Sequence, residues 1–217
     1  MIDVLTENLD GFASGLWVTT RLVAGSFVVA LVLGTLVAAL RVSGSGALRR
    51  VGTIYVETFR NVPLLVLLFI AFPGVLRGGV EISPWTAGVL ALGVYTSAYV
   101  AEVLRSGVAA VSAGQLEAGL SLGLTQVAVL RRIVLPQAFR TVIGPLGSIT
   151  IAMVKNSAIV GASIVALPDI LKEARIVNSN TFQTDAAFFW AAACYLLLTV
   201  TVTVVFRGLE SRYAIRR

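Results

Sequence analysis

Three ionisable residues interrupt apolar stretches of this sequence and are the first candidates for chemistry. Glu57 and Arg60 lie within residues 51–76, and Lys155 lies in the middle of residues 141–168, which contain no carboxylate. An ionisable group at the centre of a membrane helix costs about 2.5–3.5 kcal/mol, so it persists where it is paired or borders water. The pattern therefore predicts a polar path through a membrane, with Arg60 and Lys155 facing the carboxylates of a solute.

Neutral hydrogen-bonding residues adjoin these charges. Asn61 follows Arg60, and Asn156 and Ser157 follow Lys155. Two cations and a few neutral donors would suit an acidic amino acid, so the candidate pathway residues are Glu57, Arg60, Asn61, Lys155, Asn156 and Ser157. Two alternatives stay open. Glu57 and Arg60 are three residues apart and could form only a local ion pair, and Pro63 could make either a broken helix that lines a cavity or a packing kink.

Several kinds of site are excluded by composition. The sequence has no histidine and a single cysteine, Cys194. It therefore offers no His/Cys metal site and no histidine-based catalytic triad, and no metal is expected. The net charge of +6 comes from arginines clustered between apolar runs, which favours membrane orientation over nucleic-acid binding.

The overall composition indicates an all-α integral membrane protein. Of 217 residues, 57% are hydrophobic and 13% are charged, against roughly 25% charged residues in soluble domains. The mean hydropathy is +0.91. A soluble domain of this size could not bury so much apolar surface. A cytosolic enzyme and a disordered chain are therefore excluded.

Five membrane-spanning helices are expected in one domain over residues 1–217. A span needs about 20 apolar residues, and the expected spans are 17–40, 51–76, 82–103, 139–165 and 186–206. Residues 106–138 are expected to form short helices in a loop between the third and fourth spans. Eleven Lys and Arg residues fall on the side of this loop and three on the other, so the N-terminus is expected outside and the C-terminus inside.

A motif within this loop is the most specific signal. Residues 117–123 read Glu-Ala-Gly-Leu-Ser-Leu-Gly, nine residues follow, and residues 133–136 read Ile-Val-Leu-Pro. This pattern resembles the EAA loop of ABC importer permeases, E-A-A-x3-G-x9-I-x-L-P, with Gly119 in place of the second alanine. A short helix would present Leu120 and Leu124 to a groove, which by the resemblance belongs to an ATP-hydrolysing subunit. The alternative is an amphipathic helix that lies on the bilayer.

The residues assigned to this coupling contact are Glu117, Ala118, Gly119, Leu120, Gly123, Leu124, Ile133 and Pro136. Gly123 would permit a sharp turn, and Pro136 would start the next helical segment.

The resemblance extends over nearly the whole chain. Residues 55–65 (Tyr-Val-Glu-Thr-Phe-Arg-Asn-Val-Pro-Leu-Leu), 95–107 and 155–159 are similar to the polar amino-acid uptake group, which includes glutamate, glutamine, histidine and arginine importers. The resemblance implies a permease for a polar amino acid, with L-glutamate as the best candidate. It also implies two ATPase subunits, a second permease that is identical or paralogous, an extracytoplasmic binding protein, and a multi-pass location in the plasma membrane.

No Gly-x4-Gly-Lys-[Ser/Thr] loop occurs, so this chain is expected to bind no cofactor and ATP-Mg is expected on the partner ATPase. The alternatives are a permease for glutamine, arginine or another polar amino acid, and an ion-gradient-driven transporter, which the missing inverted repeat disfavours. A membrane-embedded enzyme is weaker still. Glu102 and Arg105 near the end of the third span are expected to reach water, Arg21 is expected to snorkel, and Trp17, Trp85 and Trp190 are expected to anchor the interface.

Overall fold

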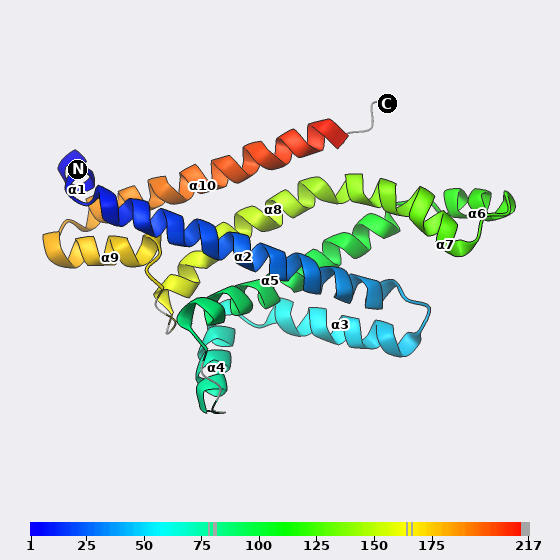
Figure 1. Cartoon of the computed structure of the whole chain (residues 1–217), viewed down its shortest axis with the longest axis horizontal. Helices are drawn as coiled ribbons and strands as arrows, with labels where there is room; N and C mark the ends of the chain where they lie inside the picture. The colour runs from blue at the N-terminus through cyan, green and yellow to red at the C-terminus, as the bar shows by residue number, and fades with distance from the viewer. Residues whose placement is uncertain (78, 80–81, 164, 166, 214–217) are drawn as a thin grey trace.

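The computed structural model describes residues 1–77, 79, 82–163, 165 and 167–213, and all regular secondary structure in these residues is helical. The elements are α1 (Ile2–Glu7), α2 (Leu9–Val42), α3 (Gly46–Asn61), α4 (Leu64–Arg77), α5 (Pro84–Ala109), α6 (Ala113–Ser121), α7 (Gln126–Val129), the π-helical turn η1 (Leu130–Val134), α8 (Leu135–Ala162), α9 (Ile170–Thr181) and α10 (Thr184–Tyr213). Figure 1 shows the N-terminus at one end of the bundle and the α6–α7 loop at the other.

The expected membrane helices are present. Among the described residues, α2, α5, α10 and the continuous helix Gln126–Ala162 are each long and apolar enough to cross a bilayer, and α3 with the start of α4 would make a fifth span. The expected all-helical membrane fold is thereby confirmed, whereas the orientation stays a prediction. Residue 164, inside the expected span 139–165, and the tail residues Arg216 and Arg217 lie outside the described residues.

The second span is broken, and the break is sharper than a kink. The axes of α3 and the first part of α4 differ by 101° across Val62 and Pro63, and Figure 1 shows α4 turned away from α3. Val62 has extended backbone angles, which the residue before a proline prefers, and Pro63 provides no N–H to continue the helix. Of the two alternatives for Pro63, a broken helix and a packing kink, the structure therefore shows the broken helix.

Other helix ends differ from the expected span ends, because an apolar run marks the part of a helix that crosses the hydrocarbon and not the full hydrogen-bonded helix. Helix α2 begins at Leu9, eight residues before the expected start, and α10 continues to Tyr213, seven residues beyond the expected end. The additional first turns of α2 place Phe12 in a buried cluster with Ile170 of α9. Helix α9 itself was not expected from the sequence.

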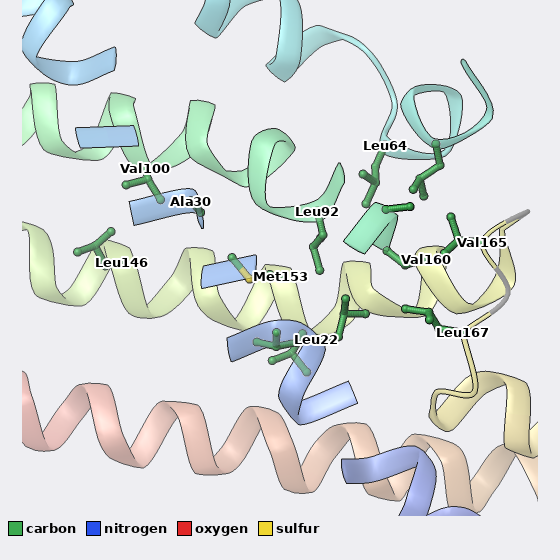
Figure 2. Close-up of a cluster of buried hydrophobic side chains, with 14 of the residues drawn as sticks. Leu22, Ala30, Leu64, Leu92, Val100, Leu146, Met153, Val160, Val165 and Leu167 are labelled. Atoms are coloured by element: carbon green, nitrogen blue, oxygen red, sulfur yellow. The ribbon is translucent and has the colours of Figure 1, made fainter. Parts of the chain in front are cut away.

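Helices α2 and α5 approach each other closely through glycines. A Cβ atom added at Gly34 would lie 2.6 Å from Cγ1 of Val100 and 2.9 Å from the carbonyl oxygen of Ser97. A Cβ atom added at Gly93 of α5 would likewise clash with the side chain of Val29 of α2. Small residues at such crossings bring helix backbones together and gain packing contacts in lipid. The core that results joins α2, α4, α5 and α8 (Figure 2).

A buried carboxylate joins α8, α9 and α10 at the N-terminal end of the bundle. Asp169 is 0% exposed and caps α9, since its Oδ1 accepts from the backbone N–H of Lys172 at 2.9 Å. Its Oδ2 accepts from the hydroxyl of Tyr195 at 3.3 Å. Gly161 leaves the space for this carboxylate, because any Cβ there would collide with it. Burial outweighs these hydrogen bonds and raises the pKa of Asp169 from 3.8 to about 6.

This pKa predicts that stability falls as pH rises from about 4 to about 6. The folded chain binds more protons than the unfolded chain in that window, so ionisation of Asp169 destabilises the fold, and the difference between 3.8 and about 6 corresponds to about 3 kcal/mol. The variant Asp169→Asn keeps a good cap and should lose most of this pH dependence. The measurement is the thermal midpoint in detergent at constant salt from pH 4.5 to 7.5.

The matched control for this prediction is Asp185→Asn, because Asp185 is exposed in the first turn of α10. It should keep the wild-type pH profile. Burial also raises the pKa of Glu173, so a small residual slope is expected in Asp169→Asn. An Asp169→Asn profile with the full wild-type slope would contradict the prediction.

The structure adds specific partners for the charged and aromatic residues near the span ends. Glu102 is partly exposed and accepts hydrogen bonds from Arg41 of α2 and from Arg105 one turn along α5. Arg21 lies over the ring of Trp85, with its Cζ 5.1 Å from the ring centre, so packing on an aromatic face holds it. The indole N–H of Trp190 donates to the carbonyl of Met1 at 2.9 Å. The interfacial role of the tryptophans stays a prediction.

Candidate functional site

The predicted cation Arg60 ends α3 and packs on an aromatic residue of α5. Its Cζ lies 5.4 Å from the ring centre of Tyr99, and the Tyr99 hydroxyl donates to the Arg60 carbonyl at 3.4 Å. The hydroxyls of Tyr99 and Tyr95 are 3.0 Å apart. Because the guanidinium is exposed and uses its face for the ring contact, its N–H edge can still bind an anion.

The local ion pair between Glu57 and Arg60 does not form. Both ion pairs found in the described part of the chain involve Glu102. The Glu57 carboxylate instead accepts from Nδ2 of Asn61 at 3.0 Å, and the same nitrogen bonds the Glu57 carbonyl at 2.7 Å. Glu57, Arg60 and Asn61 are all exposed. Arg60 is therefore not neutralised by its own helix.

A small cavity between α5 and α8 is lined in part by Tyr99, the residue on which Arg60 packs. Its volume is about 160 Å³, and its lining includes Tyr95 and Tyr99 from α5 with Met153 and Asn156 from α8. Asn156 and Arg60 are thus linked through Tyr99, which contacts the guanidinium and lines the cavity together with Asn156. Sequence reasoning missed Tyr95 and Tyr99, although their spacing of four residues in a membrane helix places two hydroxyls on one face.

Lys155 lies on another side of α8. It is exposed in an open groove of about 400 Å³ between α8 and α10, which Tyr195 and Thr199 also line. Consecutive residues of an α-helix project about 100° apart, so Lys155 and Asn156 face different spaces within this chain. Ser157 is buried and donates to the carbonyl of Val154 at 2.7 Å. The participation of these residues in a pathway stays a prediction.

The predicted coupling loop projects from the end of the bundle opposite the N-terminus (Figure 1). Helix α6 carries Glu117, Ala118 and Leu120 on its exposed surface. Gly119 faces inward, where an added Cβ would lie 2.9 Å from the side chains of Val129 and Ile133. The departure from the three-residue E-A-A pattern therefore permits a close approach between α6 and the α7–η1 segment.

The loop then reverses through Gly123, whose φ of +81° favours glycine. Leu124 is half-buried, so it contributes less surface to a partner than expected. The most exposed large apolar side chains of this loop are instead Leu122 (83%) and Val127 (73%), which sequence reasoning missed. Pro136 lies in the first turn of α8, but it does not start a separate segment as expected, because the helix continues from Gln126 to Ala162.

Comparison with known proteins identifies the family of this fold. Residues 30–215 match the family described as "Binding-protein-dependent transport system inner membrane component". The chain is 38% identical to the "Probable glutamine ABC transporter permease protein GlnM" of Bacillus subtilis, over 98% of this chain and 95% of that protein. It is 37% identical to the "Glutamate transport system permease protein GluC" of Corynebacterium efficiens, over 93% of each.

A solved structure agrees with these sequence relationships. The "Crystal structure of an amino acid ABC transporter with histidines" contains a chain that matches with a TM-score of 0.89, at 34% identity, over 96% of both chains. The resemblance expected from the sequence motifs is confirmed. The chain therefore belongs to the family of binding-protein-dependent transport system inner membrane components.

Proposed function

We propose that this protein is the transmembrane permease subunit of an ATP-driven importer of a polar amino acid, with L-glutamate as the first candidate and glutamine as the second. The observation that carries the proposal is the extent of the match: the family covers residues 30–215, and relatives named for glutamine and glutamate transport align over more than nine-tenths of the chain. Substrate choice among these amino acids is the part that experiment must decide.

The space between α3, α5 and α8 is the proposed substrate contact. The Arg60 guanidinium has no carboxylate partner in the described part of the chain and can bind a substrate carboxylate. Asn156 can donate and accept hydrogen bonds at the cavity. Lys155, Asn61, Glu57 and Ser157 remain pathway candidates. Because Lys155 is exposed at mid-helix, its groove requires cover by water or protein rather than lipid, and a second permease, identical or paralogous, is the proposed cover.

Two ATPase subunits are proposed to dock on the loops over residues 106–138, with ATP-Mg bound and hydrolysed there and no cofactor on this chain. An extracytoplasmic binding protein would deliver the amino acid at the N-terminal end of the bundle, placing the protein in the plasma membrane with its C-terminus inside. Residues Gln126–Ala162 form one continuous helix. Movement of its α7 end by the ATPase would therefore displace Asn156 and shift the permease between two conformations.

The test is uptake of radiolabelled L-glutamate, L-glutamine and L-arginine by proteoliposomes that contain the permease, its ATPase and its binding protein. We expect uptake only when ATP is supplied on the side of the membrane that carries the ATPase. The strongest uptake should be of L-glutamate or L-glutamine. Uptake that an ion gradient drives in the absence of the ATPase would support the alternative of a secondary transporter.

A substitution in the cavity should lower transport without harming the fold. Asn156→Leu removes a hydrogen-bonding group from the α5–α8 cavity, and loss of one hydrogen bond to a charged substrate corresponds to roughly tenfold weaker transport at subsaturating substrate. Asn180→Leu is the matched control, because Asn180 is exposed on α9. Lys155→Met is assayed in parallel, and unchanged affinity and rate would remove Lys155 from the pathway. Equal uptake by Asn156→Leu and Asn180→Leu would exclude Asn156.

A further inference from the structure

A separate cavity lies at the coupling-loop end of the bundle, between α2, α5 and α8. Its volume is about 400 Å³, within the roughly 300–1,000 Å³ of sites that hold small ligands. On α2 it reaches from Thr35 to Val42, about 10 Å along the helix axis. It therefore extends from the end of a membrane helix toward the depth of the acyl chains. Neither the proposed pathway nor the coupling contact uses this space.

The lining is apolar except at one end. Ala39 of α2, Leu104 of α5 and Phe139 of α8 form part of the wall, and Arg105 and Thr35 are its polar members. Val42 and Phe139 are exposed at 48% and 55%, so the cavity opens at the surface of the bundle. Water gains few hydrogen bonds in such a lining, whereas an apolar chain fits it.

Arg105 has hydrogen-bonding capacity that the described residues leave unused. One nitrogen of its guanidinium donates to Glu102, whereas its Nε–H is buried and has no acceptor in the described part of the chain. Arg41 pairs with the same carboxylate, so the three-residue group has a net charge of +1. An anion bound at Arg105 would accept from donors of this guanidinium that Glu102 leaves unused.

Two further arginines lie next in sequence to residues that line the cavity. Arg131 and Arg140 are exposed and adjoin the lining residues Leu130 and Phe139 in sequence. Basic pockets between membrane helices bind acidic lipid headgroups, and each Lys or Arg near the surface favours an anionic lipid by about 1 kcal/mol. An apolar slot with a cationic end matches the two chemical parts of such a lipid.

We propose that this cavity is a binding site for an anionic phospholipid, with one acyl chain between α2, α5 and α8 and the phosphate at Arg105. The lipid would come from the leaflet on the side of the coupling loop. Because the acyl chain would contact all three helices where α8 meets the loop, bound lipid would stabilise their mutual arrangement.

The test is native mass spectrometry of the full chain in detergent, titrated with dioleoyl phosphatidylglycerol or with dioleoyl phosphatidylcholine. We expect one phosphatidylglycerol to bind about tenfold more tightly than phosphatidylcholine. Arg105→Gln should remove that preference. Ala39→Leu fills the slot while keeping every charge and should weaken both lipids, so the proposal stays testable if Arg105→Gln does not fold.

Arg50→Gln and Ala24→Leu change exposed residues that do not line the cavity, and both should bind lipid like the wild type. Equal affinity for the two lipids in the wild type would overturn the proposal. Phosphatidylglycerol binding that is unchanged in Ala39→Leu would also overturn it. If Ala39→Leu instead weakened self-association of the chain without changing lipid binding, the cavity would be assigned to a second copy.

Discussion

Replacing Leu122 with aspartate is expected to uncouple this permease from its ATPase while leaving the helical bundle intact. Leu122 follows α6 at the tip of the projecting loop and is 83% exposed, so the substitution removes almost no packing within the chain. If the ATPase buries this leucine in a groove, an aspartate there would be a buried and unpaired charge. A loss of about 2 kcal/mol, typical of a residue that dominates an interface, corresponds to roughly thirtyfold weaker docking.

Three measurements follow this prediction. The ATPase should no longer co-purify with Leu122→Asp in detergent, the permease should no longer stimulate ATP hydrolysis, and ATP-driven uptake should fall to background. The thermal midpoint should stay within about 2 °C of wild type, as expected for a surface change of a few tenths of a kcal/mol.

Phe182→Asp is the matched control for docking. Phe182 is 88% exposed at the end of α9, and Figure 1 places α9 at the end of the bundle away from the α6–α7 loop. This variant should retain the ATPase in detergent. If Leu122→Asp also retained the ATPase but lowered the affinity of the chain for lipid surfaces, the loop would be an interfacial helix and the coupling proposal would be wrong.

Substitution of Gly34 by leucine is expected to have the largest effect on stability. The first carbon of the new side chain would already lie within 2.9 Å of the Ser97 carbonyl oxygen and within 2.7 Å of Cβ of Val100. The atoms that clash belong to the backbone and to a branched side chain of α5, so the clash is relieved only if α2 and α5 move apart. Overpacking of this kind costs about 3 kcal/mol or more, and we expect the variant to be poorly folded in detergent.

Gly208→Leu provides a sharp comparison for this effect. Gly208 lies inside α10, and a Cβ added there meets no atom within 4 Å. Because leucine favours helix over glycine by up to about 1 kcal/mol, this variant should be as stable as the wild type or more stable. The assay is fluorescence-detected size exclusion after heating. Equal thermal midpoints for the two variants would show that the Gly34 contact does not hold α2 against α5.

Part of the candidate site could be derived from the sequence. Arg60 and Asn156 stood out because charges and amides are costly in apolar segments, and the structure places both near Tyr99. Lys155 stood out for the same reason but faces a different groove. The exposed Leu122 at the loop tip could not be distinguished from Leu120 and Leu124 by sequence. All three are leucines, and they differ only in how far the rest of the chain covers them.

Helix α9 shows a signal that sequence reasoning passed over. Asp169 precedes Ile170, Ala174 and Val177, which is an N-cap followed by apolar residues at helical spacing, and all three apolar residues are buried. The segment is short and amphipathic, so a search for long apolar runs does not find it. Its buried cap, by contrast, depends on Gly161 and Tyr195, which are distant in the sequence from one another.

The sequence by itself determined that this protein is a bundle of membrane helices with a break at Pro63, because backbone hydrogen bonds within a helix are local and the hydrophobic length of a span is a sum over consecutive residues. Only the tertiary structure decided which side chains meet. A shift of one residue turns a helix face by about 100°, and that rotation is set by close contacts such as Gly34 against Ser97, which arise between segments that no local pattern relates.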